Sequence, residues 1–267
     1  MMNLTSPYKY ILANTSFPLE QYDGSKYSVL RLSRLMTMAQ RINNHFTCIV
    51  SFNTIGWQYA CMDFITYENY HGRTVIAFLT KEQMDEVLDI YGISTFKDKW
   101  LREHEPTILV HSTLLDFWHK ILEDKKLVSF RNLSNYLEKN LGLGYYLLNE
   151  PIDYADYIML CSMTDPVGEL VVATREQRKI INDVKTIFTP GVRLYFNAKL
   201  IAQDGLLVRD GTHYKVKEQL PLDKYLVDFV IVEKLSSTGY KYSIMDFIRL
   251  SNEYFNSKNC MCDMANC

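Results

Sequence analysis

Apolar residues recur along the chain with two different periods, and these periods predict both helices and strands. Between residues 28 and 42 they stand three or four apart, which is typical of an amphipathic helix. The short runs that follow are rich in β-branched and aromatic residues, so strands are expected at 46–52, 57–67 and 74–79. Thr80 and Gln83 then form a capping box, which predicts that a helix begins here and runs to about Tyr91.

The second half continues with short elements. Strands are expected at 107–110, 170–173, 193–196 and 227–232, and helices at 114–127, 133–140, 175–188 and from Ser243 to about Tyr254. Gly142 and Gly144 would end the helix at 133–140, and Asp210-Gly211 marks a turn. Because many short strands are mixed with helices, the expected fold class is α+β and not a parallel doubly wound sheet.

A charged segment at 97–105 separates the two halves and is the expected domain boundary. We therefore expect an N-terminal α+β module of unknown role at 1–104, a main domain at 105–240, and a C-terminal helix with a cysteine-containing tail at 241–267. The length of 267 residues is compatible with one large domain or two smaller ones.

Composition narrows the function classes only a little. At 48% hydrophobic residues the chain can bury a core, and its net charge of −2 gives no overall attraction to nucleic acid. No stretch approaches the roughly 20 apolar residues of a membrane span, and the N-terminus lacks the features of a signal peptide. Cys48, Cys61 and Cys161 are expected to be buried free thiols, and three more cysteines near the C-terminus have no histidine beside them, so no metal site is expected. A cytoplasmic location with no membrane partner fits these features.

One candidate for chemistry is a histidine at the end of an expected strand. His111, with Ser112 and Thr113, stands between that strand and the next helix. A histidine in this place can hydrogen-bond the ribose of a nucleotide. A second candidate is the tyrosine pair Tyr145 and Tyr146, because a tyrosine ring can stack on nicotinamide.

A third candidate is Glu218, which precedes Gln219-Leu220-Pro221. Cleavage of the nicotinamide glycosidic bond passes through an oxocarbenium-like transition state. A carboxylate can bind the ribose hydroxyls and offset the positive charge that develops there.

In this order the motifs resemble the ADP-ribosyltransferase superfamily over about residues 105–232. His111-Ser112-Thr113 is similar to the His-Gly-Thr/Ser segment of ADP-ribosyltransferases and RNA 2′-phosphotransferases, with Ser112 in place of the usual glycine. The stretch 193–226 is similar to the C-terminal part of RNA 2′-phosphotransferases, with Asn197 in place of an aspartate. Glu218 stands where several transferases, including DNA-modifying ones of the DarT type, carry their catalytic glutamate.

The resemblance implies a mixed, short-stranded split sheet of the ADP-ribosyltransferase type. It also implies NAD as a substrate, whose ADP-ribose is transferred to a macromolecular acceptor, either nucleic acid or protein. The implied catalytic residues are Glu218 and His111. The implied NAD-binding residues are His111, Ser112, Thr113, Arg131, Tyr145 and Tyr146, with Arg131 as a phosphate ligand.

Other interpretations stay open at this stage. His111 is also explained as a strand-end residue that precedes a helix cap formed by Ser112 or Thr113. Glu169 is a rival for the carboxylate and Tyr157 is a rival for the stacking ring. The alternative function is a non-catalytic binding protein, for instance of viral or mobile-element origin, that engages a host partner.

The N-terminal half resembles no family. If 28–42 were a helix, Arg31, Arg34 and Arg41 would form one basic stripe with His45, and that stripe could contact a nucleic-acid backbone. The segment 71–74, His-Gly-Arg-Thr, mimics the family's histidine motif but precedes an expected strand instead of following one.

Overall fold

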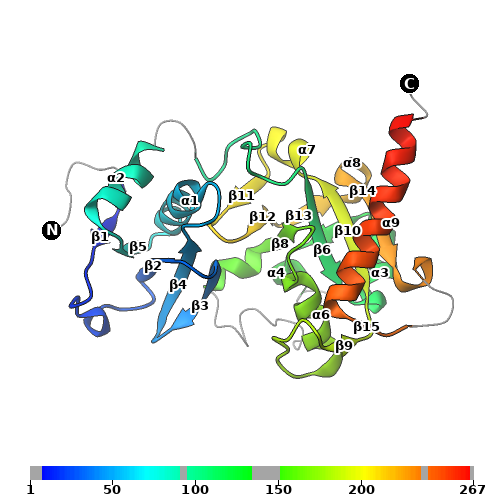
Figure 1. Ribbon diagram of the computed structural model, residues 1–267, viewed down its shortest axis with the longest axis horizontal. Helices are drawn as coiled ribbons and strands as arrows, with labels where there is room; N and C mark the ends of the chain where they lie inside the picture. The colour runs from blue at the N-terminus through cyan, green and yellow to red at the C-terminus, as the bar shows by residue number, and fades with distance from the viewer. Residues whose placement is uncertain (1–7, 91–94, 134–150, 236–239, 265–267) are drawn as a thin grey trace.

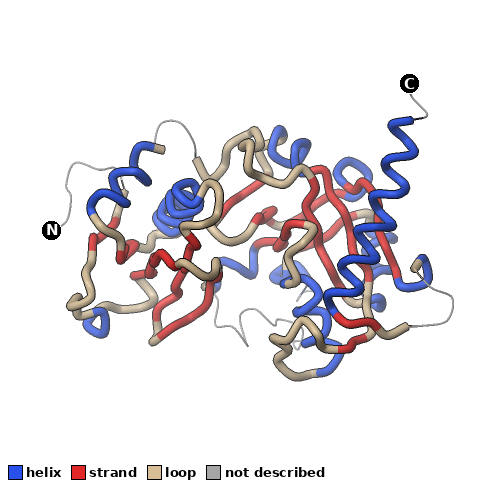
Figure 2. The backbone as a smooth tube through the Cα atoms, in the orientation of Figure 1, coloured by secondary structure: helices blue, strands red, loops and turns tan. Residues whose placement is uncertain are grey.

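The computed structural model describes residues 8–90, 95–133, 151–235 and 240–264, which form a mixed α+β fold (Figure 1). Most of the strands belong to two sheets, one in each half of the chain (Figure 2). The α+β class expected from the sequence is therefore confirmed.

The N-terminal sheet has five strands in the order β1-β5-β2-β4-β3. Its strands are β1 (Tyr10–Leu12), β2 (Tyr27–Ser33), β3 (Met38–Ile42), β4 (His45–Ser51) and β5 (Thr74–Phe78). All neighbouring strands are parallel except the edge strand β3, which is antiparallel to β4. Helix α1 (Trp57–Tyr70) connects β4 to β5, and helix α2 (Lys81–Asp89) follows β5.

Two elements of this half differ from the expectation. The segment 28–42 is not a helix but the strands β2 and β3, and 57–67 is not a strand but most of α1. The centre of β2, Ser28-Val29-Leu30, is buried on both faces, as in other parallel strands, so its apolar residues follow each other without alternation. Such a run is also compatible with helical spacing. Only the pairing of β2 with β4 and β5 shows that the segment is a strand and not a helix.

Other expectations for this half are confirmed. Strands β4 and β5 lie where the sequence predicts them, and α2 begins with the predicted capping box. In this box the Gln83 backbone N–H donates to Thr80 Oγ1 at 3.2 Å, and the Thr80 backbone N–H donates to Gln83 Oε1 at 2.9 Å.

The second sheet is antiparallel, with six strands in the order β11-β12-β8-β6-β10-β14. Its strands are β6 (Ile108–Thr113), β8 (Tyr157–Ser162), β10 (Val192–Asn197), β11 (Leu207–Arg209), β12 (Tyr214–Lys217) and β14 (Leu226–Ile231). A short pair, β7 (Lys126–Val128) with β13 (Gln219–Pro221), continues beside it, and β9 (Ile187–Phe188) pairs with β15 (Tyr242–Ser243). The predicted strands at 107–110, 193–196 and 227–232 are thus confirmed.

The helices of the second half are α3 (Leu115–Asp124), α4 (Phe130–Leu133), α6 (Val167–Gln177), α7 (Ala198–Gln203), α8 (Leu222–Tyr225) and α9 (Ile244–Met264). Short 3₁₀ turns are η1 (Leu19–Gln21), η2 (Ile152–Asp156) and η3 (Val232–Lys234). The predicted helix at 114–127 is confirmed as α3, while the helix predicted at 133–140 lies almost wholly outside the described residues. The predicted final helix extends ten residues beyond Tyr254.

Helix α6 corrects two further expectations. The strand predicted at 170–173 lies inside this helix, and the helix predicted at 175–188 covers only its end. The Asp165 side chain accepts a hydrogen bond from the Val167 backbone N–H at 2.9 Å, and Pro166 precedes the first turn, so the local start signal is helical. Of the adjacent β-branched residues, Val172 packs into a core with Phe188 and Ile244, and Val171 is partly buried beside a cavity.

The charged segment 97–105 places three buried residues between the halves, Asp98, Arg102 and Glu105, although most of its other residues are exposed. Arg102 makes two hydrogen bonds with Asp63 of α1, at 2.6 and 2.8 Å. Glu105 makes two with Arg209 of β11, at 2.5 and 2.7 Å. This ion network ties α1 to the second sheet.

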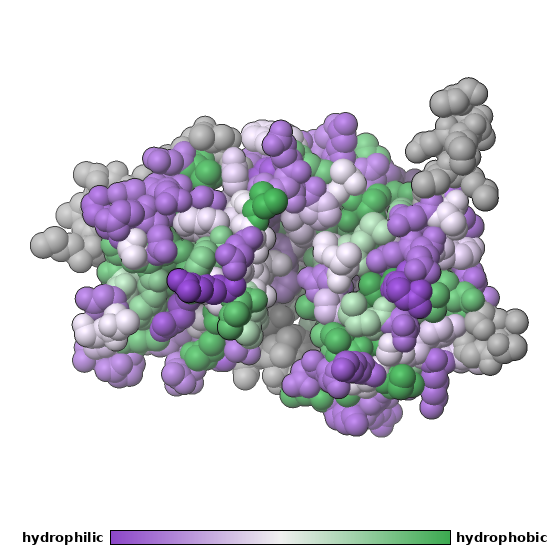
Figure 3. All heavy atoms as spheres, viewed as in Figure 1, coloured by the Kyte–Doolittle hydropathy of each residue, from purple (hydrophilic) through white to green (hydrophobic). Residues whose placement is uncertain are grey.

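The C-terminal helix α9 lies across the second sheet (red in Figure 1). Its Phe255 stacks on Tyr195 of β10 with ring centroids 4.2 Å apart, and Phe247 packs against Phe188. The described part of α9 therefore packs into the hydrophobic core of the second half. The surface seen in Figure 3 mixes hydrophilic side chains with separate groups of hydrophobic ones.

Candidate functional site

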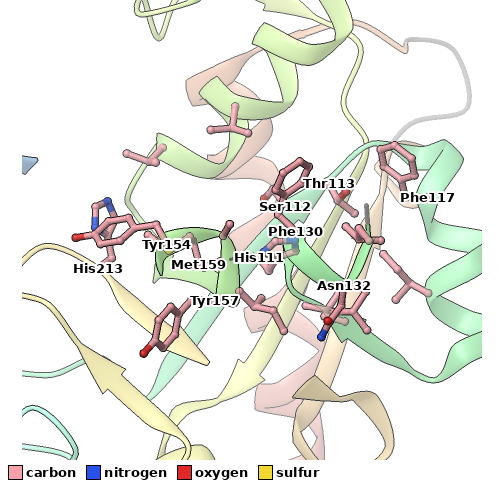
Figure 4. A pocket seen from close by; sticks show the side chains of 18 of the residues that line it. His111, Ser112, Thr113, Phe117, Phe130, Asn132, Tyr154, Tyr157, Met159 and His213 are labelled. Atoms are coloured by element: carbon pink, nitrogen blue, oxygen red, sulfur yellow. Dashed lines mark hydrogen bonds between the residues drawn. The ribbon is translucent and has the colours of Figure 1, made fainter. Parts of the chain in front are cut away.

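A cavity of about 1320 Å³ opens between the second sheet and the helices around it (Figure 4). Its walls come from β6, α3, β7, α4, η2, β8 and α6, from the turn between β11 and β12, and from the edge strand β3 of the N-terminal sheet. Both halves of the chain therefore contribute to one cavity.

His111 lines this cavity from β6. Its Nδ1 lies 2.9 Å from the backbone oxygen of Met159 on the neighbouring strand β8. Because a carbonyl oxygen only accepts, Nδ1 carries the proton and Nε2 is the accepting nitrogen. Burial lowers the pKa of His111 to about 4, and the charge of Arg175 adds to the effect while the bond to Met159 opposes it. The imidazole is therefore neutral near pH 7.

Ser112, the next residue of β6, also lines the cavity and is tied to a buried carboxylate. Its hydroxyl donates to Glu169 Oε1 at 2.5 Å, and the same oxygen accepts from the Arg193 guanidinium. Glu169 and Arg193 are both fully buried. Glu169, considered a rival catalytic carboxylate, is thus engaged in a core ion pair, and the side chain of Ser112 holds it there.

Arg175 is the most unusual charge in the cavity wall. It lies on the α6 face that also presents Val167 and Val171 to the cavity. Its Nε is buried without a hydrogen-bond partner, and no carboxylate in the described part of the chain forms an ion pair with it. Burial lowers the pKa of this guanidinium. A half-buried guanidinium that forms no ion pair is costly to desolvate, so its presence in the cavity wall points to an anionic ligand.

The remaining predicted site residues fall into three groups. Thr113 lines the cavity beside Ser112. Arg131 on α4 is turned to another partner, because its guanidinium pairs with Asp156 and donates to the Ile152 backbone oxygen at 3.1 Å. Tyr145 and Tyr146 lie outside the described residues.

Glu218 occupies the bend between β12 and β13, next to the cavity-lining Gln219. Its φ angle is 63°, a left-handed conformation that is rare for a residue other than glycine. The fold imposes this conformation, because its N–H donates to the Asp156 oxygen at 2.8 Å and its own oxygen accepts from the Ser129 N–H at 2.7 Å. The side chain is exposed and lies 3.9 Å from Lys217 Nζ. The main chain is thus fixed while the carboxylate faces solvent.

Another end of the cavity is lined by aromatic residues and the β11–β12 turn. Tyr154, Tyr157, Thr212 and His213 line this part (Figure 4). Tyr157 was the alternative stacking ring in the sequence. It also accepts or donates a hydrogen bond at 3.2 Å with His71 Nε2, so its hydroxyl is turned toward the N-terminal half.

The basic stripe expected on the first helix does not exist, because 28–42 is not helical. Arg31 stacks over Phe78, with its Cζ 3.9 Å from the ring centre. Arg41 donates to the Asn44 oxygen at 2.6 Å, and His45 is buried with its ring nitrogens near two backbone oxygens. Arg73 of the second histidine motif pairs with Glu68 and Asp153 and is structural in its contacts.

Several cavity residues carry signals that the sequence analysis missed. Val167, Val171 and Arg175 are spaced four apart, which marks one helix face once α6 is recognised as a helix. His213 follows the Asp-Gly turn that the sequence did mark. The pairing of Ser112 with Glu169 joins residues 57 positions apart, and no local pattern indicates it.

Comparisons with protein-family models, with curated proteins and with solved structures find no match for this chain. No described helix combines the length and apolar character required to cross a membrane. Among the described residues, no group of three or more histidine, cysteine, aspartate or glutamate side chains is placed to hold a metal ion.

Proposed function

We propose that this chain binds NAD in the cavity beside β6 and transfers its ADP-ribose to a macromolecular acceptor. The observation that carries the proposal is the half-buried Arg175 guanidinium, which forms no ion pair with a described carboxylate and lines the same cavity as the neutral His111. NAD supplies what these groups lack, since it carries a pyrophosphate and two riboses. The cavity, at about 1320 Å³, exceeds the roughly 300–1,000 Å³ that drug-sized ligands occupy.

Each residue then has a role that its chemistry allows. Arg175 pairs with the pyrophosphate through charge-assisted hydrogen bonds. The Nε2 of His111 accepts a hydrogen bond from a ribose hydroxyl, which requires the neutral imidazole that burial enforces. Glu218 is adjacent to the cavity-lining Gln219, and the resemblance assigns it the carboxylate that offsets the charge of the oxocarbenium-like transition state. The resemblance of residues 105–232 to ADP-ribosyltransferases supports the same assignment.

Calorimetric titration with NAD tests the proposal. The wild type is compared with Arg175→Met, and Arg178→Met is the matched control, because Arg178 is exposed just beyond the end of the same helix. We expect micromolar binding by the wild type and the control, and at least a tenfold loss in Arg175→Met, or about 1.4 kcal/mol. His111→Ala should also weaken binding.

Two results would refute the proposal. Failure of the wild type to bind NAD at millimolar concentration would favour a non-catalytic binding protein instead. Equal binding of NAD to the wild type and to Arg175→Met would place the dinucleotide elsewhere.

A further inference from the structure

The turn between β11 and β12 holds a histidine against a buried carboxylate at the cavity wall. Asp210 Oδ1 accepts from the backbone N–H groups of Thr212 at 3.0 Å and His213 at 2.6 Å. Its other oxygen, Oδ2, lies 3.2 Å from His213 Nδ1, and the Thr212 hydroxyl lies 2.8 Å from the same nitrogen. The turn therefore fixes the main chain of His213 through Asp210, and its ring through Asp210 and Thr212 together.

The turn packs closely against α1 of the N-terminal half. Gly211 has a φ of 89°, and a Cβ atom there would lie 2.4 Å from the Ala60 backbone oxygen of α1. Only glycine fits this position, because the left-handed φ disfavours other residues and a Cβ atom would clash with the Ala60 oxygen. The position of His213, which belongs to the second half and lines the cavity, therefore depends on α1.

The charges around the pair formed by His213 and Asp210, called the dyad below, favour an ionised Asp210 carboxylate. Burial opposes ionisation of Asp210, but Lys215 and His213 outweigh it and hold the pKa of this carboxyl well below its usual range. Lys215 Nζ lies 2.5 Å from Asp210 Oδ2, and the Tyr154 hydroxyl donates to the same oxygen at 2.8 Å. Lys215 also lies over the ring of Tyr154, 3.0 Å from its centre. Among the described residues, Asp210, Lys215 and Tyr154 are ionisable groups that lie around His213.

We infer that His213, oriented by Asp210, is the general base that accepts the proton of the attacking group in the transfer reaction. This inference rests on the proposed function. With Nδ1 directed to the carboxylate, Nε2 is the nitrogen that takes up a proton, and the ionised Asp210 stabilises the resulting imidazolium. His213 and Thr212 line the cavity away from His111, at the part where Tyr154 lies (Figure 4).

The step balances as a substitution at the ribose carbon that bears nicotinamide. The O–H or N–H group of the acceptor forms a bond to this carbon. The bond from the carbon to the nicotinamide nitrogen breaks, and its electron pair leaves with neutral nicotinamide. The acceptor proton goes to Nε2 of His213 and later to solvent.

Release of nicotinamide from NAD, with water as the acceptor, tests the inference without knowledge of the macromolecular acceptor. The wild type is compared with His213→Gln over the range in which histidine titrates, about pH 5 to 8. The control is His119→Gln, since His119 is an exposed histidine of α3. We expect His213→Gln to lose about 10²- to 10⁴-fold in rate and to lose the fall in rate at acidic pH, with NAD affinity unchanged.

Rescue of the reaction rate by added imidazole provides a second measurement. It would not be observed if His213 had only a structural role. It should restore part of the rate of His213→Ala, because free imidazole can occupy the vacated volume and accept the proton. No rescue, together with an unchanged pH profile in His213→Gln, would overturn the assignment.

The outcomes separate this inference from the proposed function. A wild type that binds no NAD refutes both. A wild type that binds NAD but releases no nicotinamide at any pH refutes the dyad as a base, because a base that faces the ribose carbon activates water as well. Equal rates and pH profiles in the wild type and His213→Gln refute the dyad and leave NAD binding intact.

Discussion

At the residue scale, the fully buried charged residues in the described part of the second half form ion pairs, whereas the half-buried Arg175 does not. Glu169 and Arg193 neutralise each other, and Asp210 and Lys215 do the same. Arg175 has no such partner among the described residues. Because buried ionic groups are normally paired, the exception is more informative about a ligand than the pairs are.

His111 should make the protein less stable in mild acid. Its pKa is lowered from the ordinary 6.5 to about 4 in the folded chain. Between these two pH values the unfolded chain therefore binds a proton at His111 and the folded chain does not. Stability is therefore lost as pH falls from about 6.5 toward 4, by up to on the order of 3 kcal/mol. We expect His111→Asn to lose less stability than the wild type over this window, as measured by urea unfolding at several pH values.

The comparison isolates His111 although another group titrates in the same window. Burial raises the pKa of Asp63 to about 6, so Asp63 takes up a proton more readily in the folded chain and contributes with the opposite sign. This contribution is present in the wild type and in the variant and cancels in the difference. Identical pH dependence in the two proteins would contradict the prediction.

At the element scale, the bend at Glu218 joins two strands that pair with different partners. Strand β12 pairs with β8, whereas β13 pairs with β7. The left-handed conformation of Glu218 lets the chain pass from one ladder to the other. Non-glycine residues in this region store strain and are often found at functional sites.

Replacement of Glu218 should separate strain from chemistry. Glu218→Gly removes the carboxylate and relieves the left-handed strain, so it should be more stable than Glu218→Ala by about 1 kcal/mol. Both variants should lose nicotinamide release, because neither retains the charge. Thermal unfolding and the release assay check the two statements, and retained release in Glu218→Gly would remove Glu218 from the catalytic residues.

The capping box of α2 gives an element-scale prediction that does not involve the site. Thr80→Ala removes the acceptor of the Gln83 N–H and should cost about 1 kcal/mol of stability. Thr54→Ala is the control, since Thr54 is exposed and precedes α1 without a side-chain cap. The difference is measured by urea unfolding. Equal losses in the two variants would mean that the box does not stabilise the helix.

At the scale of the whole molecule, the two halves are joined by charged groups and not by a flexible linker. Arg102 and Glu105 connect α1 to β11, and Tyr154 of η2 packs in the core of the N-terminal sheet. The cavity has walls from both halves. The N-terminal half is therefore part of the structure that forms the candidate site.

Loss of Arg102 should destabilise the whole molecule. Arg102→Met leaves Asp63 and its neighbouring carboxylates without their guanidinium, which should cost about 3–5 kcal/mol. Lys99→Met, an exposed change in the same segment, should cost little. We expect one cooperative transition by circular dichroism and by fluorescence in the wild type. Two separate transitions would show that the halves unfold independently.

Local chemistry made part of the fold predictable. The capping box at Thr80, the Asp210-Gly211 turn and the strand that ends near His111 depend on neighbours within a few residues, and all three are present in the structure. The segments 28–42 and 57–67 were assigned to the wrong type of element, because a strand buried on both faces and a helix buried nearly all round lack a clear apolar period.

The sequence by itself determined the α+β class, several element boundaries, and the placement of His111, Ser112 and Thr113 at the end of a strand that precedes a helix. Only the tertiary structure decided which charges are paired. Ser112 and Glu169, Arg102 and Asp63, and Arg209 and Glu105 meet across tens of residues. Whether a buried charge has a partner depends on packing between distant elements, and so the partnerless Arg175 became visible only in the folded chain.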